Sequence, residues 1–153
     1  MNGDSPAGAV PLLRVRGLCK YFPIYSRGFV KRRIGLVRAA DDVSFDLARG
    51  ETLGLVGESG SGKTTTGRAI LRALRPTRGA ALFQVDGRQV DLAQVWDSRL
   101  KKLRTRMQMI FQDPFSSLNP RMTVENIIGE PLKIHRLAGR DERRERVAEI
   151  LRK

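Results

Sequence analysis

Residues 57–64 read GESGSGKT, which fits the pattern Gly-x-x-x-x-Gly-Lys-Ser/Thr. Glycines at positions 57, 60 and 62 permit backbone angles and a close approach of a bound group that side chains would block. The apolar stretch TLGLV (52–56) precedes this loop and predicts a short buried strand. The stretch TTTGRAILRAL (64–74) follows it with apolar residues at helical spacing. Strand, glycine-rich loop and helix in this order predict a phosphate-binding site.

The predicted loop has three means of holding a chain of phosphates. Backbone N–H groups turn inward, and the following helix points its own N-terminal N–H groups and positive dipole end at the same anion. Lys63 brings a mobile ammonium to the outer phosphates, and the hydroxyl of Thr64 can ligate Mg²⁺. The alternative, a surface linker rich in glycine and serine, is disfavoured because a strand and a helix flank the loop.

The rest of the chain predicts a mixed α/β arrangement. Alternating or apolar stretches at 12–18, 43–47 and 81–85 predict strands, and Asp86-Gly87 after the last of them indicates a hairpin turn. The stretch Pro23 to Arg38 mixes proline, glycine and five cations, and predicts a loop or an insertion.

Beyond the helix that follows the loop, further elements are expected. Residues 99–106 predict a short basic helix, and MQMIF (107–111) predicts a strand. That strand runs directly into Gln112, whose amide at a strand tip can ligate Mg²⁺ through oxygen and orient a water without adding charge. Residues 124–128 and 141 to the end look helical.

Composition limits the class of protein. A length of 153 residues is enough for one domain, and 41% hydrophobic residues exclude a disordered chain. No apolar run is long enough to cross a bilayer, and a single cysteine, Cys19, fits a reducing compartment. The 29 Lys and Arg against 16 Asp and Glu give a net charge of +13, which can attract nucleic acid or acidic lipid.

Four segments carry a family resemblance: LGLVGESGSGKTT, QMIFQDPFSSLNPRMTV, RAADDVSFDLARGE and ENIIGEPL. The chain resembles the ATP-binding subunit of an ABC transporter of the oligopeptide/dipeptide permease group. The resemblance implies an α/β P-loop NTPase fold: an antiparallel β subdomain, a RecA-like core and the start of a helical subdomain. Residues 1–10 are expected to be a flexible tail, and residues 11–153 the N-terminal portion of an ABC ATP-binding domain.

Site residues follow from the resemblance. Thr64 and Gln112 would ligate Mg²⁺. Gln112 would also sense the γ-phosphate and connect the nucleotide site to the membrane subunits. An aromatic residue stacks on adenine in this family, and Phe22 occupies that place with Tyr21 beside it, so the choice between them is open. The residues expected around the phosphates are Gly57, Ser59, Gly60, Ser61, Gly62, Lys63, Thr64 and Thr65.

Several parts of such an ATPase do not occur in these residues. No GGQ is present, and no apolar strand ends in Asp-Glu, so the signature motif, the Walker B acids and the switch histidine are missing. We therefore expect an N-terminal fragment that is not catalytically competent by itself, because hydrolysis needs a positioned water and charge stabilisation at the γ-phosphate.

The expected function is to couple ATP binding and hydrolysis to import of di- or oligopeptides, at the cytoplasmic face of the membrane. Expected partners are transmembrane permease subunits, a second ATP-binding subunit and, indirectly, a peptide-binding protein. Nickel, glutathione or another solute remains open as cargo. Two alternatives stay open: a nucleic-acid-associated ABC ATPase, motivated by the charge, and a non-catalytic ATP-binding remnant. No nucleic-acid partner is expected, because the SLNPRMT segment (117–123) is typical of the peptide permeases.

Overall fold

A computed structural model describes residues 10–111 and 118–153. The chain divides into two compact units, Met1–Trp96 and Asp97–Lys153, and each is described by itself. Among the described residues, no helix has both the length and the apolar character needed to cross a bilayer.

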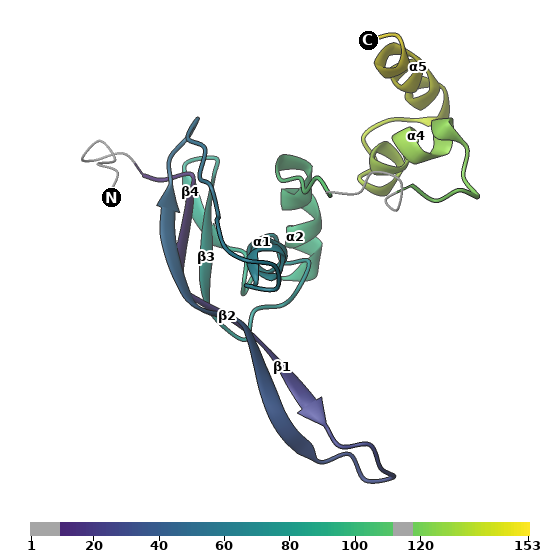
Figure 1. Cartoon of the computed structure of the whole chain (residues 1–153). Helices are drawn as coiled ribbons and strands as arrows, with labels where there is room; N and C mark the ends of the chain where they lie inside the picture. Colours follow the sequence, from purple (N-terminus) through teal and green to yellow (C-terminus); the bar gives the residue numbers. More distant parts are fainter. Residues whose placement is uncertain (1–9, 112–117) are drawn as a thin grey trace. The chain divides into compact units, whose positions relative to one another are not determined.

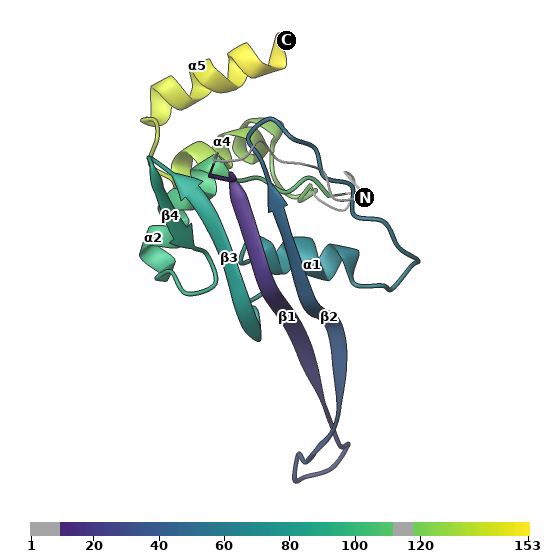
Figure 2. The ribbon, with the colours of Figure 1, turned by 90° about the vertical axis from the view of Figure 1, so that its left-hand side faces the viewer.

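The first unit is built on a four-stranded antiparallel sheet with the order β2-β1-β3-β4 (Figures 1 and 2). One helix, α1 (Lys63–Ile70), packs against the β1–β2 part of this sheet. The strands are β1 (Leu13–Tyr25), β2 (Arg33–Leu47), β3 (Arg78–Val85) and β4 (Arg88–Asp91). The antiparallel β subdomain is therefore present, as expected from the sequence.

The core of this unit lies between β1 and α1. Val15 and Leu18 are fully buried, and they cluster with Ala69 and Ile70 of the helix. Burying a side chain of this size stabilises the fold by roughly 1.5–3 kcal/mol. Ile70, one of the apolar residues whose spacing predicts the helix, thus lies on the face that meets the sheet, but the helix ends there and does not continue to residue 74 as the sequence predicts.

A β-bulge at Gly17 sets which side chains of β1 enter the core. The register shifts between Val15 and Leu18, and Gly17 adopts a φ of 55° while its N–H donates to Ser44 Oγ at 2.8 Å. Simple alternation would bring residue 17 to the face of Val15, but the extra residue brings Leu18 there instead. The bulge therefore places a leucine in the core at an even-numbered position.

The stretch 23–38 is not the loop that the sequence predicts. β1 continues to Tyr25 and β2 begins at Arg33, so only a short turn joins them, closed by Ser26 N donating to Arg32 O at 2.8 Å. Aromatic and branched residues on both sides favour pairing over a loop. Pro23 is tolerated because the pairing of β1 with β3 ends at Cys19 and leaves that edge of β1 open.

Two predicted strands are absent. Residues 52–56 and 107–111 form no β-ladder with any described residue, and Val56 and Ile110 are 95% and 89% exposed. A short apolar strand of this kind is stable only with neighbouring strands and with helices over both faces. The described sheet is antiparallel and offers neither segment a partner, so these two predictions are wrong for this structure.

The second unit is helical and begins with α2 (Asp97–Leu103) and a 3₁₀ turn, η1 (Arg104–Arg106). Thr123 caps the next helix, α4 (Val124–Ile134), by accepting a hydrogen bond from Asn126 N at 3.3 Å. α4 contacts α5 (Arg140–Leu151), with Gly129 allowing close approach to the buried Val147. The helices predicted in this part of the chain are confirmed.

Candidate functional site

The glycine-rich loop turns tightly before α1. Ser61 N donates to Glu58 O at 3.2 Å, and Gly60 and Gly62 adopt φ values of 81° and 93°. A Cβ on Gly62 would lie 1.8 Å from the carbonyl oxygen of Ala39, so no side chain fits there. The two positions therefore need glycine for backbone conformation, and Gly62 needs it for space as well.

Lys63 folds back over this loop. Its ammonium donates to the carbonyl oxygens of Gly57 at 2.6 Å and Glu58 at 2.5 Å, and to Ser61 Oγ at 3.3 Å. None of these three acceptors is a charged group. The loop therefore holds a cation that no carboxylate neutralises through these hydrogen bonds, which suits a site for an anion.

Besides the Lys63 ammonium, the loop region offers backbone N–H donors at the start of α1. The helix N-cap is Gly62, and the first helical hydrogen bond runs from Thr66 N to Gly62 O at 2.8 Å. The N–H groups of Lys63, Thr64 and Thr65 precede that bond and have no acceptor within the helix. No acidic residue lies in the first turn, so the positive end of the helix dipole is not offset.

The loop and the helix start together fit a multiply charged oxyanion such as a phosphate chain. Residues 57–65 contain backbone N–H donors, the Lys63 ammonium and glycines that leave room for a bound group. The hydroxyl of Thr64 lies on an exposed residue, whereas Thr66 is buried and its hydroxyl donates to Gly62 O at 3.0 Å. Of these two threonines, Thr64 is thus the one that a metal ion could reach.

The two aromatic candidates lie close to this loop in the sheet. Gly62 lies against Ala39, and the residues on either side of Ala39 pair with Tyr21 and Lys20 of the neighbouring strand. Paired strands lie about 4.8 Å apart, so the aromatic pair and the loop are separated by little more than one strand.

Tyr21 and Phe22 point to opposite faces, because successive residues of a strand alternate. The Lys20 ammonium stacks 4.9 Å from the centroid of the Phe22 ring and also donates to the carbonyl of Arg75, which follows α1. Phe22 is 38% exposed and its ring makes no hydrogen bond. Phe22 therefore lies on the same face of β1 as Lys20, the face toward Arg75, and part of its side chain is exposed.

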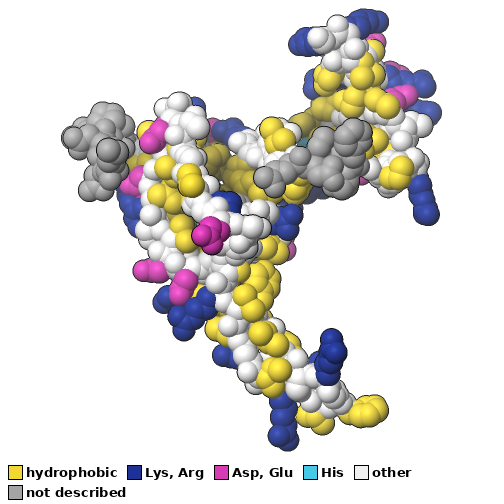
Figure 3. All heavy atoms as spheres, in the orientation of Figure 1, with side chains coloured by type: hydrophobic (Ala, Val, Ile, Leu, Met, Phe, Trp, Pro, Cys, Tyr) yellow, Lys and Arg dark blue, Asp and Glu magenta, His cyan; other side chains and the backbone are white. Residues whose placement is uncertain are grey.

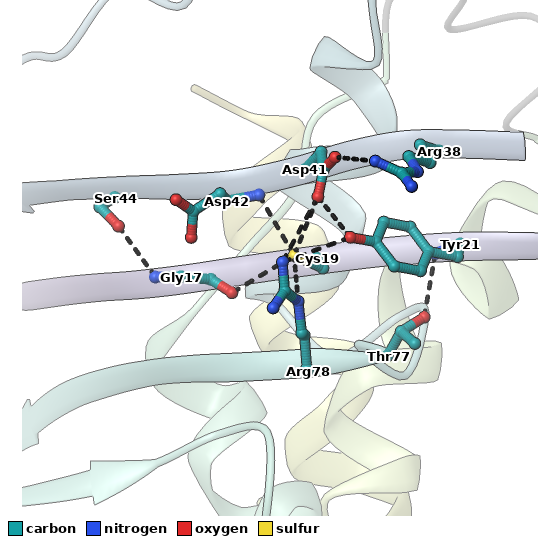
Figure 4. A network of polar contacts seen from close by, with 9 residues as sticks. All are labelled: Gly17, Cys19, Tyr21, Arg38, Asp41, Asp42, Ser44, Thr77 and Arg78. Atoms are coloured by element: carbon teal, nitrogen blue, oxygen red, sulfur yellow. Dashed lines mark hydrogen bonds and ion pairs between the residues drawn. The ribbon is translucent and has the colours of Figure 1, made fainter.

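Tyr21 is instead part of a polar network on the other face (Figure 4). Its hydroxyl donates to the carboxylate of Asp41, which also pairs with Arg38 at 3.2 Å and Arg78 at 3.6 Å. The fully buried Cys19 accepts from Arg78 Nε at 3.0 Å. Tyr21 is thus fixed by its hydroxyl. Its contact with Asp41 and that of Arg78 with Cys19 join residues 20 and 59 positions apart, so no sequence pattern indicates them.

The network shifts two titrations in opposite directions. Donation to Asp41 raises the pKa of Tyr21 to about 12, and the same hydrogen bond lowers the pKa of the Asp41 carboxyl. Because the pKa of Tyr21 is raised, protonated Tyr21 contributes to the free energy of unfolding. That contribution is fully present at pH values below the ordinary tyrosine pKa, and it is lost as pH rises through about 12. The ionised Asp41 carboxylate contributes to the free energy of unfolding at pH values above the ordinary pKa of aspartate. That contribution is lost as pH falls through the lowered pKa.

We expect this to be visible in an absorbance titration of the tyrosinate form. A Tyr25→Phe variant leaves Tyr21 as the only tyrosine, and its titration should centre near pH 12. Adding Asp41→Asn removes the charged acceptor and should move the titration down toward the ordinary value of about 10. A titration that is the same in both variants would contradict the assigned hydrogen bond.

One predicted site residue, Gln112, lies outside the described residues. The other predicted phosphate-binding residues lie in the loop and helix start described above, and Ser59 and Gly60 lie at the exposed turn of that loop. No group of three or more His, Cys, Asp or Glu side chains suited to a metal ion occurs among the residues that the structure describes.

A glycine-rich loop of this geometry, directly before a helix on a chain of this fold, defines a P-loop protein. Residues 40–153 match the family described as ABC transporter, and the chain belongs to that family. Two solved structures of the ABC transporter cassette MJ0796, both dimeric and one bound to ADP and Pi, have a TM-score of 0.67 and 25% identity to this chain. They cover 92% of this chain and 56% of the MJ0796 chain.

Curated relatives have similar sequences over most of the chain. The oligopeptide transport ATP-binding protein AppF of Bacillus subtilis is 48% identical over 141 residues, which are 92% of this chain and 41% of AppF. The glutathione import ATP-binding protein GsiA of Salmonella choleraesuis is 47% identical over 148 residues, 97% of this chain and 23% of GsiA. The chain thus spans about two fifths or less of the length of these relatives.

Proposed function

We propose that the protein is the ATP-binding subunit of an importer, coupling ATP binding and hydrolysis to uptake of di- or oligopeptides through a membrane permease. The observation that carries the proposal is the loop at 57–64, where Lys63 and the start of α1 offer donors to one anion. The names of relatives such as AppF support peptides as the cargo class.

The proposal gives each of the predicted site residues a physical role. ATP, when bound, supplies a chain of phosphates whose outer oxygens Lys63 would hold, while Thr64, together with Gln112, would hold Mg²⁺. The ring of Phe22 would stack on adenine, because Phe22 is partly exposed whereas the hydroxyl of Tyr21 is tied to Asp41. The residues proposed around the phosphates are Gly57, Ser59, Gly60, Ser61, Gly62, Lys63, Thr64 and Thr65.

The choice between the aromatics gives a direct test. Phe22→Ala should weaken ATP binding by roughly two- to tenfold, the range expected for loss of one aromatic stack. Phe22→Trp should retain the affinity, and Tyr21→Phe should change it little. Titration calorimetry with ATP and with inorganic tripolyphosphate separates stacking from phosphate binding, since only ATP should respond. Equal loss for both ligands would refute the stacking role.

The partners proposed are transmembrane permease subunits and a second ATP-binding subunit, with a peptide-binding protein acting indirectly. The dimeric MJ0796 cassettes support pairing of ATP-binding subunits. Attachment to the permease would place the chain at the cytoplasmic face of the membrane.

Uptake measurements in cells test the whole proposal. Deleting the gene should abolish uptake of labelled di- and oligopeptides, and the wild-type gene should restore it while a Lys63→Ala gene should not. Parallel uptake of labelled glutathione and nickel ions identifies the cargo if peptides are unaffected. Unchanged uptake of all three solutes would overturn the transport role.

A further inference from the structure

The β1–β2 hairpin continues well past the rest of its sheet. β1 pairs with β3 only as far as Cys19, whereas its pairing with β2 runs to Tyr25 opposite Arg33. We call residues 21–38 the arm. Figure 2 shows it as a two-stranded ribbon extending beyond the ends of β3 and β4. No residue of the arm is buried.

The arm carries an unusual amount of exposed apolar surface. Phe29 at the turn is fully exposed, and Val30 beside it is 70% exposed. A two-stranded ribbon has no second layer to cover such side chains, and isolated hairpins are at best marginally stable in water. Contiguous exposed apolar side chains mark an interaction surface. The large exposed hydrophobics of the arm are Phe22, Ile24, Tyr25, Phe29, Val30, Ile34, Leu36 and Val37.

The charges of the arm have a single sign. Arg27, Lys31, Arg32 and Arg33 surround the turn, and no acidic residue occurs from Tyr21 to Ala40. None of these four cations forms an ion pair with a residue that the structure describes. The fifth cation of the arm, Arg38 at its base, does pair with Asp41, as Arg14 and Arg16 of β1 pair with Asp46. Figure 3 shows hydrophobic and basic side chains together along the arm.

We infer that the end of the arm binds an anionic lipid surface, with Phe29 and Val30 entering the boundary between headgroups and acyl chains. Uncompensated cations gain from anionic headgroups, and an aromatic side chain beside them gains from the apolar layer below. A nucleic-acid duplex, whose bases are already stacked, would complement the cations alone and leave the apolar turn in water. The inference rests on arm residues only and does not depend on the proposed nucleotide binding.

Vesicle binding of the whole chain tests this. The chain should co-sediment with vesicles of equal parts phosphatidylglycerol and phosphatidylcholine, and much less with pure phosphatidylcholine. Each cation near an anionic surface contributes about fivefold in partitioning, so Lys31→Gln with Arg32→Gln should reduce binding about 25-fold. The matched control, Lys101→Gln with Lys102→Gln on α2, removes the same charge from an exposed pair and should have a much smaller effect.

Insertion of the turn is tested separately. Phe29→Trp in a Trp96→Phe background places the only tryptophan at the turn, and its emission should shift to the blue with the anionic vesicles. Phe29→Ser should lower binding at constant charge. Both positions are exposed, so circular dichroism should show the fold unchanged.

Two outcomes would overturn the inference. Equal losses in the arm variant and the α2 variant would mean that net charge alone attracts the chain. Binding of a DNA duplex that depends on the arm, with no arm dependence for vesicles, would assign the surface to nucleic acid instead. ATP affinity measured on the same variants should be unchanged, so failure here is distinguishable from failure of the nucleotide site.

Discussion

Replacing Lys63 by alanine is expected to weaken binding of MgATP by about ten- to hundredfold. A charge-assisted hydrogen bond contributes roughly 1.5–3 kcal/mol, and every 1.4 kcal/mol corresponds to about tenfold in affinity. The ammonium already lies over the loop, where the carbonyl oxygens of Gly57 and Glu58 accept its hydrogen bonds. Titration calorimetry with MgATP and with tripolyphosphate gives the two affinities, and both should fall.

The control for this variant is Lys101→Ala, which removes an exposed lysine from α2 and should leave the affinity unchanged. Thermal unfolding of both variants checks that Lys63→Ala has not simply loosened the loop by freeing its carbonyls. An affinity for MgATP that is equal in wild type and Lys63→Ala would remove the main support for the phosphate site.

ATP turnover by the purified chain is expected to equal that of the Lys63→Ala variant. The 153 residues include neither a signature motif nor an Asp-Glu pair after an apolar strand. Lys63 and Gln112 would therefore act without the carboxylates and the signature loop that the family resemblance implies for hydrolysis at the γ-phosphate. Turnover that Lys63→Ala abolishes would show that these residues are catalytically sufficient.

The site was largely predictable because its information is local. The glycines and Lys63 lie within eight consecutive residues, and the steric reason for Gly62 and the position of the ammonium both agree with the motif. The sequence offers both Tyr21 and Phe22 for stacking, and our proposal of Phe22 rests on the contacts with Asp41 and Lys20, which no local pattern indicates.

Secondary structure was predictable where a segment with a helix or strand pattern in the sequence also has an element to pack against or pair with in the structure. β3, its hairpin turn and α1 were expected close to where they occur. The arm was missed because proline, glycine and cations weaken the strand pattern, although pairing partners exist. Residues 52–56 show the reverse case, a strong strand pattern that has no partner among the described residues and stays exposed. Local pattern indicates which segments can pair, and only tertiary context decides which do.

Gly79 is a position in the sheet where we expect a large loss of stability from adding one methyl group. A Cβ there would lie 2.3 Å from the carbonyl oxygen of Gly17 and 2.6 Å from Leu18 Cα, and the residue has a φ of 88°. These neighbours are backbone atoms of the bulge that brings Leu18 into the core, so no side chain can move aside. Gly79→Ala should lower the free energy of unfolding by about 2–5 kcal/mol, from backbone strain and overpacking together.

Gly50→Ala is the matched control, because Gly50 has a similar φ of 79° and nothing within 4 Å of its added Cβ. It carries the cost of the left-handed conformation without the collision, about 1–2 kcal/mol. Urea unfolding followed by circular dichroism gives both losses, and the difference between them measures how rigidly β3 is held against the Gly17 bulge. Equal losses would mean that the two strands separate at little cost, and that the bulge does not fix the position of Leu18 in the core.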